Sequence, residues 1–410
     1  MAYTRRDFLK GSITALSLTL AAPRFMIGSR ALAQSANNRI LVVLQLDGGN
    51  DGLNTIVPYT DKTYYSLRPT LAIPENSVLK VTDKLGFHPV MTKFKALFDQ
   101  GHIAVVQNTG YPSPDLSHFR SRAIYQRADP TTQEEQVQLG WLGKYADLKL
   151  AQNGSTLAVV NIGGTLPKSL ISEKVIAPSI NNFELYRFQT DAKYPTDRNN
   201  QLNTLRKDYG VKTDSLDYLY IEQTGLDALD SSESLQASLQ KYTPEITYAN
   251  DGLSRQLQMA AQVIAADLGT QIIHLTFGGF DTHAGQKADH EELLTALSDG
   301  LDAFYRDLVR LNKADNVLLL AFSEFGRRPK ENGSLGTDHG APGPMFVLGN
   351  KVKGGFYGNT LNLEDLDRAG NAKFDIDFRA VYGTVLSDWL ATDAASVLGQ
   401  QFENIGFITQ

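Results

Sequence analysis

The chain contains no cysteine among its 410 residues. A thiol nucleophile, thiolate-bound zinc, iron–sulfur clusters and disulfide bonds are therefore all excluded. Any metal ion bound by the protein must rest on carboxylates, imidazoles, hydroxyls and carbonyl oxygens. Candidate metal ligands are accordingly sought among Asp, Glu and His.

Long apolar runs and an excess of positive charge are also missing. Residues 13–22 form a weakly apolar stretch that is too short and too rich in Ser and Thr to span a bilayer. The net charge is −6 at pH 7, so nucleic acid is not expected as a partner. With 42% hydrophobic and 20% charged residues, the composition is typical of a folded protein without a stable membrane span.

The first 33 residues have the features of a signal peptide. Residues 4–10 carry a twin arginine followed by an apolar pair, and residues 31–33 supply a small-x-small cleavage pattern. This order is typical of a signal read by the twin-arginine translocase, which exports folded proteins in bacteria. We therefore expect a periplasmic or secreted protein. A frayed N-terminal helix is the alternative interpretation.

Strand and helix patterns alternate through the rest of the chain. Short apolar runs indicate buried strands, and apolar residues spaced three or four apart indicate helices. The expected strands are 40–46, 103–107, 157–162, 271–277, 317–322 and 345–348, and the expected helices are 90–100, 117–127, 253–268, 290–311 and 375–391. This alternation predicts an α/β fold with a mostly parallel central sheet covered by helices on both faces.

One region departs from the alternation. Residues 167–248 are polar and suggest short helices without a strand. We interpret residues 34–410 as a single domain in which 167–248 form a partly helical insertion or cap. A long surface excursion without a role is an equally open interpretation.

The first candidate site follows the first strand, where Asp47 and Asp51 flank a glycine-rich turn. A carboxylate beside glycines, which let the backbone come close, suits a cation site. A tight turn with an Asp capping a helix explains the same residues.

The second candidate lies at an expected helix start. Ser117 could act as a nucleophile, with His118, Arg120 or Arg122 nearby, because free N–H groups at a helix N-terminus attract anions. A plain N-cap role for Asp115 or Ser117 is the alternative.

The third candidate is the pair Asp281 and His283, which follows the strand 271–277. Side chains two residues apart on an extended segment point the same way, so both could reach one ion. His274, within that strand, is expected to be a buried structural histidine.

The fourth candidate spans residues 323–344. Glu324 leaves a strand end, Arg327 and Arg328 could hold an oxyanion, and Asp338 with His339 adds an acid–imidazole pair. A solvated basic turn and a hydrogen-bonded loop are the alternatives for these residues.

Together these clusters place carboxylates and imidazoles at the ends of neighbouring strands, where ligands bind in open α/β sheets. The predicted metal ligands are Asp47, Asp281, His283, Glu324, Asp338 and His339, and the predicted catalytic residues are Ser117, Arg120 and Arg327. This pattern indicates a hydrolase of anionic esters that uses one or two divalent cations, which could be Zn, Ca, Mn or Mg.

These motifs resemble an exported bacterial family, the domain of unknown function 1501. The resemblance rests on the twin-arginine leader and on residues 46–52, 278–283, 323–327 and 336–340, and it covers almost the whole chain. That family is similar to the alkaline phosphatase and sulfatase superfamily, which implies an alkaline phosphatase-like α/β fold with a two-metal site. Asp47 would match the first-strand carboxylate, Ser117 the nucleophile region, and Asp281 with His283 an acid–histidine pair.

The sequence departs from that superfamily's pattern in its ligand set. Phe325 stands where a ligating histidine would follow an acid, and Asp281 and His283 are two apart rather than four. The set is then one ligand short. The expected function is an exported metal-dependent hydrolase of phosphate or sulfate esters, acting on a small-molecule or polysaccharide ester. The alternative is a non-catalytic envelope or carbohydrate-binding protein that retains the fold.

Overall fold

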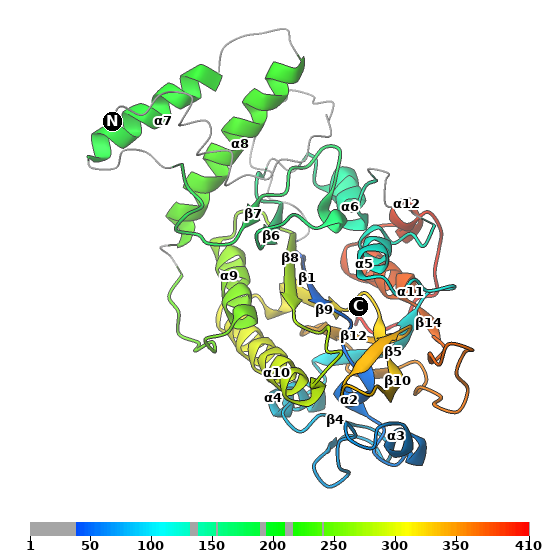
Figure 1. The fold of residues 1–410 in the computed structure, drawn as a ribbon. Coiled ribbons are helices and arrows are strands. Elements are labelled where there is room, and N and C mark those ends of the chain that lie inside the picture. The colour runs from blue at the N-terminus through cyan, green and yellow to red at the C-terminus, as the bar shows by residue number, and fades with distance from the viewer. Residues whose placement is uncertain are drawn as a thin grey trace. The chain divides into compact units, whose positions relative to one another are not determined.

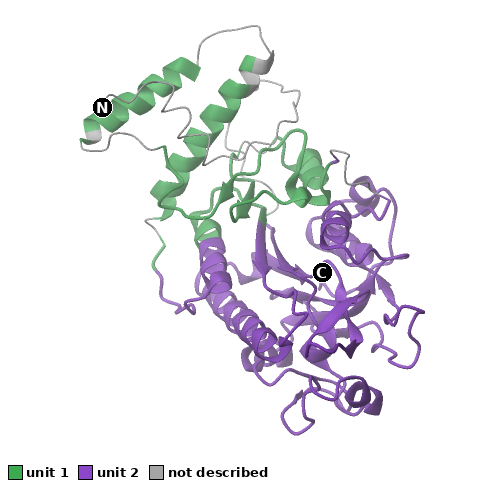
Figure 2. Ribbon diagram, in the orientation of Figure 1, with its two compact units in different colours: residues 1–38, 139–243, 262–273 green, residues 39–138, 244–261, 274–410 purple. Residues whose placement is uncertain are grey.

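The computed structural model describes residues 38–131, 138–152, 155–188, 194–209, 216–239 and 242–409 (Figure 1). The expected signal peptide, residues 1–33, lies outside the described residues. The chain divides into two compact units, unit 1 with residues 1–38, 139–243 and 262–273, and unit 2 with the remainder (Figure 2). All the predicted site residues belong to unit 2. The single domain 34–410 stays a prediction.

Unit 2 is built on a large sheet whose strands run in the order β13-β5-β12-β9-β1-β8. The bounds of these strands are β1 Ile40–Asp47, β5 Ile103–Gly110, β8 Ile272–Gly278, β9 Val317–Phe322, β12 Gly343–Leu348 and β13 Gly355–Tyr357, with β14 Ile376–Asp377 paired to β5. β1 pairs with β9, and β13 and β14 pair with β5, all in parallel. β12 runs antiparallel to both β5 and β9. The sheet is therefore mostly parallel.

The central pair β1 and β9 fixes the register of the sheet. Ile40 lies opposite Val317 and Gln45 opposite Phe322, so the two strands leave the sheet at the same edge. Six of the eight β1 residues are apolar and its first seven are buried, as expected for a strand covered on both faces. Asp47 and the Ser323-Glu324 pair are thereby placed at one edge.

Helices cover both faces of this sheet (Figure 1). They are α4 Thr92–Asp99 and α10 Gln286–Arg310 on one side, with α5 His118–Arg127 and α11 Phe378–Thr384 on the other. Phe94 of α4 packs on Phe346 of β12, with ring centroids 5.3 Å apart. Tyr125 of α5 stacks on Phe322 of β9 at 5.7 Å. Because Phe346 lies opposite Ala321, the neighbouring Phe322 faces the other side.

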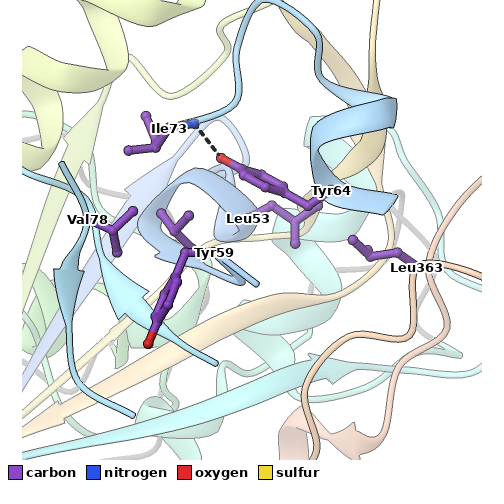
Figure 3. Close-up of a cluster of buried hydrophobic side chains, with 7 residues drawn as sticks. Leu53, Tyr59, Tyr64, Ile73, Val78 and Leu363 are labelled. Atoms are coloured by element: carbon purple, nitrogen blue, oxygen red, sulfur yellow. Dashed lines mark hydrogen bonds between the residues drawn. The ribbon is translucent and has the colours of Figure 1, made fainter. Parts of the chain in front are cut away.

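Smaller elements surround the carboxyl edge of the sheet. They are α2 Gly52–Thr55, α3 Lys62–Leu67, the small sheet of β2 Ile56–Val57, β4 Gly86–Phe87 and β3 Leu79–Lys80, and the hairpin of β10 Gly326–Glu331 and β11 Thr337–Gly340. Leu53, Tyr59, Tyr64, Val78 and Leu363 belong to a buried cluster that fastens α2 and α3 (Figure 3). The C-terminal part adds a π-helical turn, Val385–Trp389, and α12 Ala394–Leu398.

Unit 1 contains the short parallel pair β6 Val159–Ile162 and β7 Ser179–Ile180, with α6 Trp141–Lys149, α7 Pro195–Tyr209 and α8 Leu216–Leu239. Two details of residues 167–248 differ from expectation. Helix α8 has 24 residues, and β7 supplies a short strand. Helix α9, Gly252–Ala266, spans residues of both units. The role of 167–248 as an insertion or cap stays a prediction.

The predicted α/β class and mostly parallel central sheet are confirmed. Every expected strand is present, and α10 begins at Gln286, four residues earlier than expected. In the described part of the chain, no helix has the length and apolar character needed to cross a membrane.

Candidate metal centre

The site is assembled from segments at the carboxyl edge of the sheet in unit 2. Asp47 ends β1, His118 begins α5, and Asp281 and His283 follow β8. Glu324 lies between β9 and β10. The hairpin supplies Arg327 on β10 and both Asp338 and His339 on β11.

Three imidazoles surround the carboxylate of Asp281. The Nε2 atoms of His283 and His339 each lie 3.1 Å from Asp281 Oδ1, and the two nitrogens are 2.9 Å apart. His118 Nε2 lies 3.4 Å from Asp281 Oδ2. The ligating atoms of His118, Asp281 and His339 all fall within 4.8 Å of one another. We call His118, Asp281, His283 and His339 the His–Asp cluster.

The outer ring nitrogen of each histidine faces an oxygen. His118 Nδ1 is 2.9 Å from Glu324 Oε1, and His339 Nδ1 is 2.8 Å from the Leu116 carbonyl oxygen. His283 Nδ1 is 3.5 Å from Asp338 Oδ1. An acceptor at Nδ1 keeps the proton there and leaves Nε2 free, which is how protein histidines are held when they ligate a metal.

The spacing of the inner atoms fits one small cation. Ligand atoms at the corners of a tetrahedral zinc site, with bonds of about 2.0–2.1 Å, stand roughly 3.3 Å apart. Among His118, Asp281 and His339, whose ligating atoms all lie within 4.8 Å of one another, the contacts of 3.1 and 3.4 Å to the Asp281 carboxylate are close to that spacing. The His283 Nε2 lies 3.1 Å from Asp281 Oδ1 and 2.9 Å from the His339 Nε2. His118 Nε2 is also buried and makes no hydrogen bond within the described residues. The donor set therefore fits a metal ion.

Charges around the cluster stabilise an ionised Asp281. Burial by itself would raise the pKa of this carboxyl, but the hydrogen bond and the positive charge of the Arg327 guanidinium lower the pKa to about 2. The hydrogen bond to Glu324 raises the pKa of His118, whereas burial lowers the pKa of His339. The centre is thus an anionic carboxylate ringed by imidazoles, and the Asp281 side chain is 48% exposed.

Glu324 and Asp338 lie behind the cluster rather than in it. The buried Glu324 carboxylate accepts the Gly48 N–H at 3.0 and 3.1 Å and contacts His118. Asp338 accepts a hydrogen bond from Asn332 Nδ2 at 3.1 Å and contacts His283. Both carboxylates are placed to orient histidines, which differs from the direct ligation expected from the sequence.

Asp47 belongs to a neighbouring group. Its Oδ1 lies 3.0 Å from Arg122 Nε and 3.2 Å from Gln45 Nε2. Burial, together with the negative charge of Glu324, raises the pKa of Asp47. Asp47 is thus held beside Glu324 and Arg122, outside the four-residue cluster.

The three predicted catalytic residues occupy different environments. Ser117 is the exposed N-cap of α5, and its hydroxyl makes no capping hydrogen bond. Arg120 is half-buried and donates to the Pro130 carbonyl oxygen at 3.3 Å, while its Nη1 is buried without a hydrogen-bond partner in the described chain. Arg327 is buried and bonded to Asp281 and to backbone carbonyls. Of the three, Ser117 has an exposed side chain directly beside a cluster member, His118.

His118 is the member that the sequence did not place among the ligands. His118 begins a helix, where an imidazole is commonly a surface or capping residue. The functional role in this segment was instead predicted for the neighbouring Ser117, as a nucleophile. The His118 ring packs against Phe325 and His339, with centroids 4.9 and 4.4 Å apart. Phe325, which stands where another ligand was expected, thus supports two histidines instead. The only indication in the sequence was the position of His118 beside Ser117, a candidate nucleophile at an expected helix start.

Comparisons with known proteins add a family. The family model described as "Protein of unknown function (DUF1501)" matches residues 38–388. This match confirms the resemblance read from the sequence motifs. No curated protein sequence matches the chain.

Several solved structures are similar to this chain at low identity. Ps i-CgsB in complex with k-i-k-neocarrahexaose is 12% identical, over 89% of this chain and 73% of that chain, with a TM-score of 0.39. PsFucS1 sulfatase from Pseudoalteromonas sp. is 11% identical, over 91% and 74%, with a TM-score of 0.36. A mutant alkaline phosphatase of the Antarctic bacterium TAB5 with Mg in its M3 site is 12% identical, over 76% and 90%, with a TM-score of 0.33.

Proposed function

The chain belongs to the DUF1501 family, and from the geometry of its His–Asp cluster we propose that it is a metal-dependent hydrolase of anionic phosphate or sulfate esters. One observation carries the proposal. Three histidines have their Nδ1 atoms held by oxygen acceptors and their Nε2 atoms gathered around the Asp281 carboxylate. We further propose that the protein acts in the periplasm or outside the cell after export by the twin-arginine translocase.

The metal would be held by His118, Asp281, His283 and His339. Three imidazole nitrogens and one carboxylate suit zinc better than calcium or magnesium, which prefer oxygen ligands alone. A bound divalent cation polarises the ester oxygen and lowers the pKa of an attacking hydroxyl or water. Asp281 and His283 leave the site open, because their side chains are 48% and 44% exposed.

Groups around the cluster would bind and orient the ester. Ser117 places an exposed hydroxyl one residue before His118, where it is available as a nucleophile. The N–H groups of the first turn of α5 attract the anionic oxygens of the substrate. Arg120 adds a guanidinium whose Nη1 makes no hydrogen bond within the described residues. A small-molecule ester and a polysaccharide ester both satisfy this chemistry.

Turnover by the purified mature chain tests the proposal. With added zinc, manganese, magnesium or calcium, we expect hydrolysis of an aryl phosphate or an aryl sulfate. The variants Asp281→Asn and His339→Ala should lose at least about 100-fold in kcat/KM while keeping the wild-type circular dichroism spectrum. His102→Ala removes a histidine outside the cluster and should retain full turnover.

One observation favours the second candidate, a non-catalytic binding protein. Asp47, the expected first-strand ligand, is engaged by Arg122 and Gln45 outside the cluster. A site with a single metal could retain the fold for recognition of a carbohydrate or another exported partner. The absence of turnover on both aryl esters, with metal bound in stoichiometric amount, would support this candidate and overturn the hydrolase.

A further inference from the structure

Arg327 is the most heavily bonded side chain near the His–Asp cluster, and its guanidinium is fully buried. Its Nε donates to the Gly49 carbonyl oxygen at 2.8 Å, and its Nη1 to the Thr337 carbonyl oxygen at 2.8 Å. Its Nη2 contacts the carbonyl oxygens of Gly48 and Phe280, the latter at 2.9 Å, and Asp281 Oδ1 at 2.7 Å.

These acceptors come from three separate segments. Gly48 and Gly49 follow β1, Phe280 and Asp281 follow β8, and Thr337 begins β11, two residues before His339. Arg327 itself lies on β10. The planar guanidinium, with its five N–H groups, therefore links the three segments that surround the cluster. A lysine ammonium cannot reproduce this arrangement.

The turn after β1 is shaped to reach this guanidinium. Gly48 has a φ of +120°, and a Cβ atom there would lie 2.4 Å from the Asp281 nitrogen. Gly49 has a φ of +83°, and a Cβ atom there would lie 2.5 Å from the Phe325 ring. Only glycine permits so close an approach. The sequence motif Asp47-Gly48-Gly49 thus serves the packing of the turn against Arg327 and Asp281.

Little of Arg327 is left for a substrate. Four carbonyl oxygens and one carboxylate oxygen accept from its three nitrogens, and Asp281 is the only charged acceptor among them. An arginine that clamps an ester oxyanion would instead present free N–H groups to the site.

We propose that Arg327 is a positioning residue, which fixes the Asp281 carboxylate and the backbone around it for the metal and does not bind the ester. This inference rests on the proposed metal centre. Partners that orient metal ligands set metal affinity, and their loss commonly weakens binding 10–100-fold. Arg327 is therefore expected to act on metal affinity.

Arg68 provides a matched control. It is also fully buried and also bonded to β10, since it donates to the carbonyl oxygens of Arg328 and Pro329 at 3.1 and 2.8 Å. Its charged partner is Asp51, which lies outside the His–Asp cluster. Replacement of either arginine by lysine disturbs a buried guanidinium group, Arg327 on β10 and Arg68 bonded to β10 from the end of α3, but only Arg327 contacts a cluster residue.

Zinc affinity of the full chain, measured by competition with a chelator, tests the proposal. Arg327→Lys should bind zinc about 10–100-fold more weakly than the wild type, whereas Arg68→Lys should stay within about 3-fold. At saturating zinc, the KM of Arg327→Lys for an aryl phosphate should equal that of the wild type. Wild-type zinc affinity in Arg327→Lys, an equal loss in Arg68→Lys, or a raised KM with unchanged zinc affinity would overturn the proposal.

Hydrogen exchange of the wild type gives an answer even if Arg327→Lys does not fold. The amides of Gly48, Gly49 and Phe280 donate to Glu324, Ser323 and the Asp47 carbonyl oxygen. Because Arg327 fixes the backbone of these residues without a metal, these amides should be protected equally in the metal-free and zinc-loaded protein. Protection that appears only with zinc would refute the positioning role. A wild type that binds no metal would defeat the proposed function, while exchange in the metal-free protein would still report whether the turns around Arg327 are ordered.

Discussion

Each histidine of the His–Asp cluster uses its two ring nitrogens for different tasks. Nδ1 is occupied by Glu324, Asp338 or the Leu116 carbonyl oxygen, and Nε2 faces Asp281. The oxygen acceptors therefore fix the tautomer and the ring orientation before any metal arrives. This division explains why Glu324 and Asp338, which the sequence suggested as metal ligands, contact the histidine Nδ1 atoms instead.

Substitution of Glu324 tests this division of tasks. Glu324→Gln keeps the size of the side chain and one oxygen for the Gly48 N–H, but it weakens the charged contact with His118 Nδ1. We expect zinc affinity to fall about 10-fold or more, measured by chelator competition. Glu331→Gln is the control, because Glu331 accepts from the Thr70 and Leu71 amides, away from the cluster. Equal zinc affinity in the two variants would contradict the role given to Glu324.

His274 is a buried histidine outside the site, and both its ring nitrogens lack hydrogen-bond partners among the described residues. Burial lowers the pKa of His274 from 6.5 to about 3. Below pH 6.5, the unfolded chain therefore takes up a proton that the folded protein does not. The free energy of unfolding must then fall as the pH drops from 6.5 towards 3.

His274→Leu removes this acid sensitivity. Between pH 7.5 and pH 5, its free energy of unfolding should gain about 2 kcal/mol relative to the wild type, because one pKa unit corresponds to about 1.4 kcal/mol. Urea denaturation at the two pH values measures the difference. His102→Leu, which removes a half-buried histidine, should show a smaller gain. A gain for His274→Leu that does not depend on pH would contradict this explanation.

At the level of elements, a buried ion pair joins the start of α2 to the end of α3. Asp51 caps α2 and lies 2.6 Å from Arg68 Nη1, and Arg68 also binds backbone carbonyls of β10. Burial opposes ionisation of Asp51, but the Arg68 guanidinium prevails and lowers its pKa. This stabilisation is present above the unfolded-state pKa of Asp and is lost as the pH falls through the lowered folded-state value.

Asp51→Asn leaves Arg68 buried without a charged partner. The expected cost is about 3–5 kcal/mol in the free energy of unfolding at pH 7, because a buried charge then loses its partner. Glu75→Gln breaks the exposed pair with Lys80 and should cost less than about 1 kcal/mol. Urea denaturation of both variants gives the comparison. Equal costs would show that burial of the Asp51 pair does not matter.

The elements differ in how far the sequence predicted them. Buried strands such as β1 and β9 are nearly continuous apolar runs, and α10 has a clear apolar stripe. The sequence therefore predicted these strands and this helix. The β10–β11 hairpin was not among the expected strands, because residues 326–340 contain charges, glycines and a proline without alternation. Its strands form through tertiary contacts, such as those of Arg327 and Arg68, that no local pattern encodes.

At the scale of the whole molecule, the topology brings distant residues to one sheet edge. The mostly parallel sheet could be predicted from alternating strands and helices, and with it the placement of Asp47 and Glu324, which follow the parallel strands β1 and β9, at one edge. The sequence could not predict which residues form the His–Asp cluster and which only contact its histidines, because this depends on side-chain directions. His118 was missed for the same reason, since a helix start does not reveal where an imidazole points.

A metal that binds only the folded protein must stabilise it. Zinc at about 100 times its Kd should add about 2.7 kcal/mol to the free energy of unfolding, and a chelator should remove this gain. Thermal unfolding followed by circular dichroism should therefore show a higher Tm with zinc for the wild type and for His102→Ala. His339→Ala should show no such rise. A zinc-induced rise of equal size in His339→Ala would place the stabilising metal elsewhere.

Anomalous scattering from crystals of the zinc-loaded protein shows whether the His–Asp cluster binds the metal. One strong zinc peak is expected about 2.0–2.2 Å from the Nε2 atoms of His118, His283 and His339 and from the Asp281 carboxylate. A map without a peak among these four side chains, or with zinc bound only elsewhere on the protein, would contradict the proposed metal centre.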